Sequence, residues 1–143
     1  MPPPTLTRIF DLTKKAHYFE GEIDSKKKNL ASTGEKTLTY KDEHKNTTAT
    51  YNYSLIPAVQ DLTTLFQNLS ITLEAGRRLE FDRRYQKLAL DEELKRMVDL
   101  ASRNELGDVA VIGKALQAIA EDNSVTNGAR VRAQRLLGSN QAK

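Results

Sequence analysis

Few residues of this sequence have the types and spacing that chemistry requires. The two histidines, His17 and His44, are not spaced to each other or to a cysteine as metal ligands are. The acidic run 91–93 resembles a general acid/base set, but it opens onto Lys95 and Arg96, so its carboxylates are predicted to be surface charge. No phosphate-binding glycine loop, nucleophile elbow or zinc-protease motif occurs. The sequence therefore predicts a protein that is not an enzyme, with no catalytic residue, metal site or cofactor.

Charge offers a second kind of chemistry, because the C-terminal segment 127–138 is basic and no acidic residue follows Asp122. Three interpretations stay open: contact with nucleic acid, docking of a protein, or solvated arginines that interact with the negative end of a helix dipole. A helix-turn-helix is disfavoured, since the connection 122–127 exceeds the three or four residues of that motif. The candidate nucleic-acid contacts are Lys26, Lys27, Lys28, Arg130, Arg132 and Arg135.

Composition limits the classes of protein further. The absence of cysteine excludes disulfides, thiolate catalysis and cysteine-bound metals. With 143 residues, of which 38% are hydrophobic, the chain can bury only a modest core, which favours a subunit whose apolar surface a partner completes. No apolar run has the length of a membrane span, and the first ten residues do not resemble a signal peptide. We expect a protein that is intracellular (cytoplasmic) or within an assembled particle, without membrane insertion.

One domain is expected over residues 1–143, beginning with an extended proline arm at 1–4. An apolar stripe predicts a helix over 5–20, although the alternation in HYFEGEID also permits a strand, so helix and strand stay open for residues 5–23. A surface loop is predicted at 24–36.

The alternation then changes to a period of two, which predicts a β-hairpin over 37–55. Leu38 and Tyr40 lie on one side of a polar tip, with Tyr51 and Tyr53 on the other. Because two strands alone are barely stable in water, this hairpin must pack on helices or on another chain.

Long or broken helices are predicted over 55–104. Their first part has a heptad-like apolar seam, and Gly76 marks an expected break or kink. The second part has acid-before-base pairs at i,i+4 and its own apolar stripe, expected to pack on the first helix. The seam is Leu55, Val59, Leu62, Phe66, Leu69 and Leu73, the stripe is Phe81, Tyr85, Leu88, Leu94, Met97 and Ala101, and the pairs are Glu80–Arg84, Asp91–Lys95 and Glu92–Arg96.

A helical hairpin is predicted over 106–138, followed by a tail at 139–143. Asp108 and Asn127 are the expected N-caps of its two helices, and Gly138 is the expected stop.

These patterns predict a mainly α (α+β) fold, a helical bundle with one small antiparallel β-hairpin and an extended proline-rich N-terminal arm. The expected function is a non-enzymatic structural or adaptor subunit in a larger assembly, such as a virus-type particle, a filament or a multi-subunit complex. The alternative is a small basic nucleic-acid-binding protein that uses the arginine helix. Other protein subunits in a homo- or hetero-oligomer are the expected partners, and no small-molecule substrate is evident. The candidate partner contacts are Pro2, Pro3, Pro4, Tyr51, Tyr53, Arg130, Arg132 and Arg135.

Overall fold

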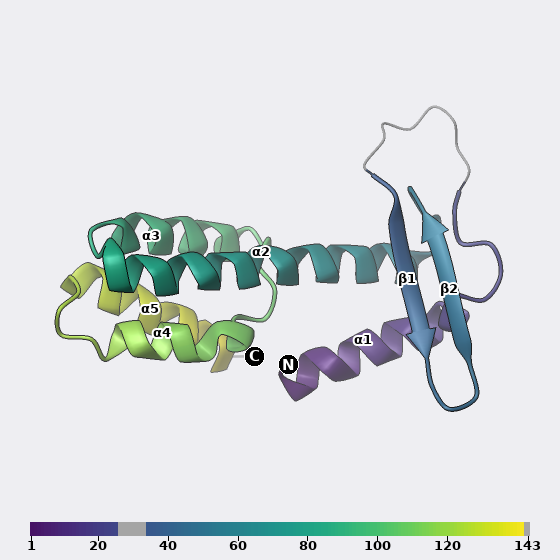
Figure 1. Cartoon of the computed structure of the whole chain (residues 1–143), viewed down its shortest axis with the longest axis horizontal. Helices are drawn as coiled ribbons and strands as arrows, with labels where there is room; N and C mark the ends of the chain where they lie inside the picture. The colour runs from purple at the N-terminus through teal and green to yellow at the C-terminus, as the bar shows by residue number, and fades with distance from the viewer. Residues whose placement is uncertain (26–33, 142–143) are drawn as a thin grey trace. The chain divides into compact units, whose positions relative to one another are not determined.

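The structure is a computed structural model that describes residues 1–25 and 34–141. This part of the chain contains five α-helices and one two-stranded antiparallel sheet (Figure 1), which confirms the predicted mainly α fold with a small β-hairpin. Its residues group into a hairpin unit, Pro3–Leu65, and a helical unit that begins at Phe66. The helix α2, Pro57–Tyr85, contributes residues to both. The expectation of a single domain stays a prediction.

The predicted proline arm is wrong at its inner boundary, because α1, Pro3–Lys15, begins within it. Proline is tolerated in a first helical turn, where its missing N–H would have no intrahelical partner. Helix rather than strand is therefore the correct interpretation of the residues that follow, and α1 buries Leu12 and Thr13.

This helix ends at Lys15, not at residue 20 as predicted, because the next residues turn with the opposite hand. His17, Tyr18 and Phe19 form a single 3₁₀ turn (η1) in which φ is 54°, 54° and 64°. Residues with a Cβ rarely adopt positive φ, so contacts with the rest of the hairpin unit must stabilise this turn. The Thr47 hydroxyl donates to the Tyr18 carbonyl at 2.6 Å, and the Tyr18 and Tyr40 rings lie 4.7 Å apart.

The predicted hairpin is present, with somewhat shorter strands, β1 Lys36–Lys41 and β2 Asn46–Tyr51. Leu38 pairs with Ala49, and the exposed face carries facing threonines whose hydroxyl oxygens are 3.3 Å apart in each pair, Thr37 with Thr50 and Thr39 with Thr48. The other face points inward, which confirms the alternation predicted from the sequence. Tyr53 lies beyond β2 rather than within it.

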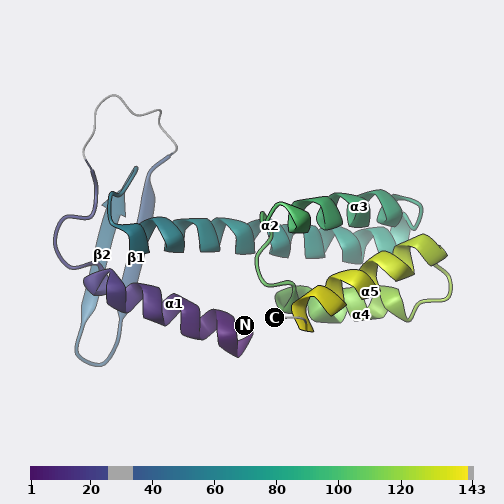
Figure 2. The same ribbon diagram turned by 180° about the vertical axis from the view of Figure 1, so that it is seen from behind.

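The inward face of the hairpin closes a small core with α1 and the first turns of α2 (Figure 2). Tyr51 is 4% exposed, and its hydroxyl is 2.6 Å from that of Thr63. The hairpin thus packs on helices of its own chain, as its marginal size requires. The buried members of this core are Leu12, Ala16, Phe19, Ile23, Ala49, Tyr51, Ala58, Val59 and Leu62.

Along α2, the buried row differs from the predicted seam. Leu62 and Leu69 are buried as expected, but Leu55, Phe66 and Leu73 are 56%, 39% and 45% exposed. The buried row instead continues from Leu69 through Thr72 and later positions at spacings of three and four, so it drifts off the predicted seam. The row comprises Leu62, Leu69, Thr72, Ala75, Gly76 and Leu79.

The expected break at Gly76 is also wrong, since α2 runs through it to Tyr85. A Cβ at Gly76 would overlap the side chain of Ile112, so this glycine provides close packing rather than a break. Thr72 is fully buried and satisfied: its hydroxyl donates to the Asn68 carbonyl at 2.8 Å and accepts from the Gly107 N–H at 2.8 Å.

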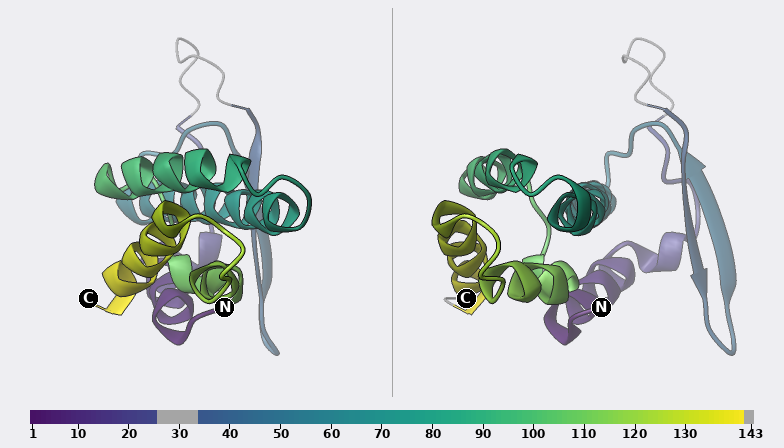
Figure 3. Two further views of the ribbon diagram at one scale, coloured as in Figure 1. Left: turned by 90° about the vertical axis from the view of Figure 1, so that its left-hand side faces the viewer. Right: turned by 60° about the vertical axis from the view of Figure 1, so that its left-hand side comes forward.

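The chain reverses over residues 86–88 into α3, Ala89–Ser102, and continues through the 3₁₀ turn Val109–Ile112 (η2), α4 Gly113–Ala120 and α5 Asn127–Gln141. Within the helical unit, these helices and the second half of α2 surround one apolar core (Figure 3). Its fully buried large side chains are Leu79, Leu90, Leu94, Met97, Leu116, Ile119 and Leu136.

The predicted ends of the helical hairpin are right only in part. The Asp108 carboxylate accepts from the Ala110 N–H at 3.0 Å, as a cap should, but it caps η2. At the start of α5 it is the Thr126 hydroxyl, not Asn127, that accepts from a backbone N–H, that of Ala129 at 3.2 Å. Gly138 does not stop α5, which continues to Gln141 and takes in part of the expected tail.

Candidate protein-docking surface

The three arginines of α5 do not form one open cationic patch. Arg132 pairs with Asp91 of α3, and Arg130 donates from Nη1 to Asn123 Oδ1 at 3.1 Å. Only Arg135 is exposed without a hydrogen bond or ion pair to the described residues. The candidate contacts Lys26, Lys27 and Lys28 lie outside the described residues.

The other sequence-predicted contacts also separate. Tyr51 is buried in the core, whereas Tyr53 is 40% exposed and its hydroxyl accepts from Gln60 Nε2 at 2.9 Å. Pro3 and Pro4 are exposed in the first turn of α1, and Pro2 before them is half-buried. Among the predicted contacts that the structure describes, therefore, the exposed residues come from three separate segments: Pro3 and Pro4, Tyr53, and Arg135.

A larger exposed apolar surface lies at the end of α2. Phe81, Tyr85 and Leu88 are 51%, 71% and 87% exposed, and the two aromatic rings lie 5.1 Å apart. These residues belong to the predicted stripe, whose later members Leu94 and Met97 are fully buried as predicted. The stripe divides because the turn at 86–88 gives α2 and α3 separate axes, and the two helices face the core with different rows.

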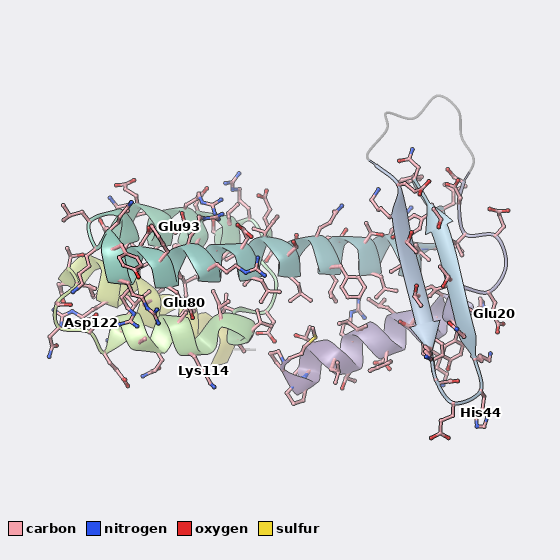
Figure 4. All side chains as sticks on the ribbon, in the orientation of Figure 1. Glu20, His44, Glu80, Glu93, Lys114 and Asp122 are labelled. Carbon is pink, nitrogen blue, oxygen red and sulfur yellow. The ribbon has the colours of Figure 1, made fainter. Side chains whose placement is uncertain are left out.

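Charged side chains fix the flank of this surface that lies toward α3. Arg78 Nε and Arg96 Nη2 each donate to Glu93 Oε1 at 3.0 Å. Burial tends to raise the pKa of Glu93, but these two hydrogen bonds outweigh it and the pKa lies below its ordinary value. Asp82 has the opposite shift: burial and the Glu93 carboxylate raise its pKa. Glu93 is labelled in Figure 4.

Toward α4, an open groove of about 480 Å³ adjoins the same helix. Its apolar lining includes Leu73, Val111 and Ile112, and its charged lining is Arg77, Glu80 and Lys114. Glu80 on α2 and Lys114 on α4 are labelled in Figure 4. The "docking surface" below means Phe81, Tyr85 and Leu88 together with the flanking residues Glu80 and Arg84.

The polar tip of the hairpin is held by hydrogen bonds and an ion pair within the hairpin unit. Asp42 Oδ1 accepts from the His44 N–H at 2.7 Å and from the Lys45 N–H, and the hydrogen bond from the Tyr40 hydroxyl lowers the pKa of Asp42. Lys45 bonds Glu20 at 2.9 Å, and this bond raises the pKa of the lysine. The tip is thereby tied to the turn at η1. No group of side chains suited to a metal ion occurs within the described ranges.

Comparisons with known proteins give no relative: the sequence matches no family model, no curated protein and no solved structure. Among helices in the described part of the chain, none combines the length and apolarity needed to cross a membrane.

The docking surface is not among the predicted contacts, although Phe81, Tyr85 and Leu88 belong to the predicted apolar stripe. A signal for it exists in the sequence: Thr72, Ala75, Gly76 and Leu79 form a second row on α2, and small residues favour close helix packing. A helix that packs through that row leaves Phe81 and Tyr85 uncovered.

Proposed function

We propose that this protein is a non-enzymatic structural or adaptor subunit, and that it holds another protein through the docking surface of α2. The observation that carries the proposal is the exposure of Phe81 and Tyr85 as neighbouring rings, with Leu88 also exposed three residues later in the chain. Adjacent exposed apolar side chains mark interaction sites, and aromatic residues are enriched in the cores of protein interfaces. Burial of an aromatic anchor such as Tyr85 supplies much of the binding energy in such interfaces.

Photocross-linking in the cells that make the protein tests this proposal. A photoreactive phenylalanine analogue at Tyr85 is expected to give covalent adducts with protein, and a Phe81→Ser, Leu88→Ser background should reduce them strongly. The same analogue at Gln134, an exposed polar position on α5, is the matched control. If Tyr85 gives no more adducts than Gln134, the docking proposal is wrong.

A nucleic-acid-binding function is the alternative, and the contacts of Arg130 and Arg132 support it less than an open cationic face would. It predicts binding of duplex DNA or RNA at low salt that weakens steeply as salt increases. Substitution of the one freely exposed arginine of α5, Arg135→Ala, should then weaken binding and flatten this salt dependence. Adducts to nucleic acid in the cross-linking experiment would favour the alternative.

A further inference from the structure

The docking surface carries two opposite charges that the described part of the molecule leaves unpaired. Glu80 and Arg84 each precede an aromatic residue of the surface by one position, so they form a row along one side of Phe81 and Tyr85. Their i,i+4 spacing predicts an ion pair within the helix, but no ion pair or hydrogen bond joins either side chain to the described residues. By contrast, the neighbouring arginines are occupied: Arg77 pairs with Glu74 at 3.4 Å, Arg78 with Glu93 at 3.0 Å and Arg83 with Asp122 at 3.6 Å.

The opposite side of the aromatic pair is already filled within the helical unit. Arg78 and Asp82 lie on that side and face Glu93 of α3. A partner that covers the rings therefore finds its free charges only in the Glu80 and Arg84 row. This row is self-complementary, since it carries one acid and one base.

We infer that the partner on the docking surface is a second copy of this chain, packed antiparallel along the end of α2. The inference rests on the proposed function, because it names the partner of the same surface. A two-fold axis that passes beside α2, between the two copies and level with residues 82 and 83, places Glu80 opposite Arg84 of the second copy. By symmetry, Arg84 then faces Glu80 of that copy, so each contact occurs twice.

The same axis places the ring of Phe81 beside Tyr85 of the second copy. Aromatic pairs of this kind add to the gain from burying their apolar area. Corresponding sides of two helices meet only when the helices run antiparallel. In a parallel pair, the free charges of one copy would instead meet the opposite side of α2 in the second copy, where Arg78 and Asp82 already face α3. Charge complementarity thus selects the antiparallel arrangement.

Charge reversal tests the inference directly, with analytical ultracentrifugation over a range of concentrations. The wild-type protein is expected to self-associate, and Glu80→Arg or Arg84→Glu alone should weaken self-association about tenfold or more, because each places like charges opposite each other twice. An equimolar mixture of the two variants should associate again. One variant then carries arginine at both positions and the other carries glutamate at both, so each of the two contacts joins an arginine with a glutamate. Loss of an ion pair within one helix could not be rescued by mixing.

Arg135→Glu, a charge reversal at an exposed position of α5, is the matched control and should leave self-association unchanged, with circular dichroism verifying that each variant is folded. A strictly monomeric wild-type protein, or two single variants that stay monomeric when mixed, would overturn the inference. If the wild type is monomeric while Tyr85 still cross-links to a different protein, the proposed function stands and only the identity of the partner is wrong. Absence of both results rejects both proposals.

Discussion

The hairpin unit and the helical unit reach stability by different means. In the helical unit, large aliphatic side chains such as Leu79, Leu94 and Leu116 are fully buried, and ion pairs join separate helices at the rim. The core of the hairpin unit instead includes small residues such as Ala49 and Ala58, and hydroxyl groups complete its packing, as in the Tyr51–Thr63 contact at 2.6 Å.

This difference shows how one chain of modest hydrophobicity supports two cores. Where helices supply long leucine rows, burial of apolar area dominates and charges are left to the rim. Where a threonine-rich hairpin supplies one side of the core, its strands contribute few large apolar groups, and directional hydrogen bonds help to fix the arrangement.

Truncation of a core leucine is the largest expected effect. Leu94→Ala should destabilise the protein by about 2–5 kcal/mol, the cost of a cavity in a well-packed core. Hydrogen exchange should show the loss of protection mainly in α3 and α5, and Leu62→Ala should show it mainly in β1 and β2, because the two residues belong to separate cores. Equal loss of protection in both units for either variant would contradict the division into two cores.

Introduction of a methyl group at the closest packing site should be the next largest effect. Gly76→Ala would force Ile112 to shift, at a cost of about 1–3 kcal/mol. Gly113→Ala is the control, since no atom lies within 4 Å of its added Cβ, and it should be neutral or stabilise by up to about 1 kcal/mol. Urea unfolding measures both, and equal effects would disprove the packing role of Gly76.

In the hairpin unit, loss of a single hydroxyl should be measurable. Tyr51→Phe is expected to lower the free energy of unfolding by about 1 kcal/mol, because Thr63 loses its buried partner while it still donates to the Val59 carbonyl. Tyr53→Phe removes a more exposed hydroxyl, so it should lower the free energy of unfolding by less. Thermal unfolding of the two variants and the wild type measures both effects. A larger loss for Tyr53→Phe would reverse the argument.

Two neighbouring carboxylates of the helical unit should respond to pH with opposite signs. Glu93 has a lowered pKa, so its stabilisation is present above the ordinary glutamate pKa and is lost as pH falls through the lowered value. At neutral pH, Glu93→Gln should therefore cost about 1 kcal/mol, and the cost should vanish in acid.

Asp82 has a raised pKa, so its contribution is most favourable at low pH and is lost as pH rises through the raised value. Asp82→Asn should accordingly increase stability slightly at neutral pH and have no effect in acid. Urea unfolding at several pH values checks both variants, and effects of the same sign at neutral pH would contradict the assigned contacts.

The smallest effects are expected on the arginine helix. Arg132→Ala breaks the half-exposed pair with Asp91 and should cost about 0.5 kcal/mol, less in high salt. Arg135→Ala should have no measurable effect on thermal stability. An equal loss for both variants would show that the pair between α3 and α5 contributes nothing.

Much of the fold follows from local patterns. The period of two fixed the hairpin, whose strands pair with Leu38 opposite Ala49, and the row at Leu94 and Met97 fixed the buried face of α3. Boundaries were harder: proline in a first turn is compatible with both an arm and a helix, and glycine at position 76 is compatible with both a break and a close contact. The second possibility is the correct one at both positions, and at position 76 it depends on Ile112, a neighbour distant in sequence.

The candidate site shows the same limit. Glu80 and Arg84 have the spacing of an ion pair, yet neither has a partner among the described residues. Arg132 has no acidic residue near it in the sequence, yet it pairs with Asp91 of α3. Spacing along a helix states which side chains are able to meet, but not which competing partner is nearer.

By itself, the sequence determined the helical class, the presence of the hairpin and the absence of any disulfide, because these depend on periodicity and residue type. Only the tertiary structure decided which of two apolar rows on α2 is buried and which charges are already neutralised. Those outcomes depend on where α3, α4 and η2 lie against α2. Contacts between residues far apart in the chain produce no periodic pattern in the sequence of either segment.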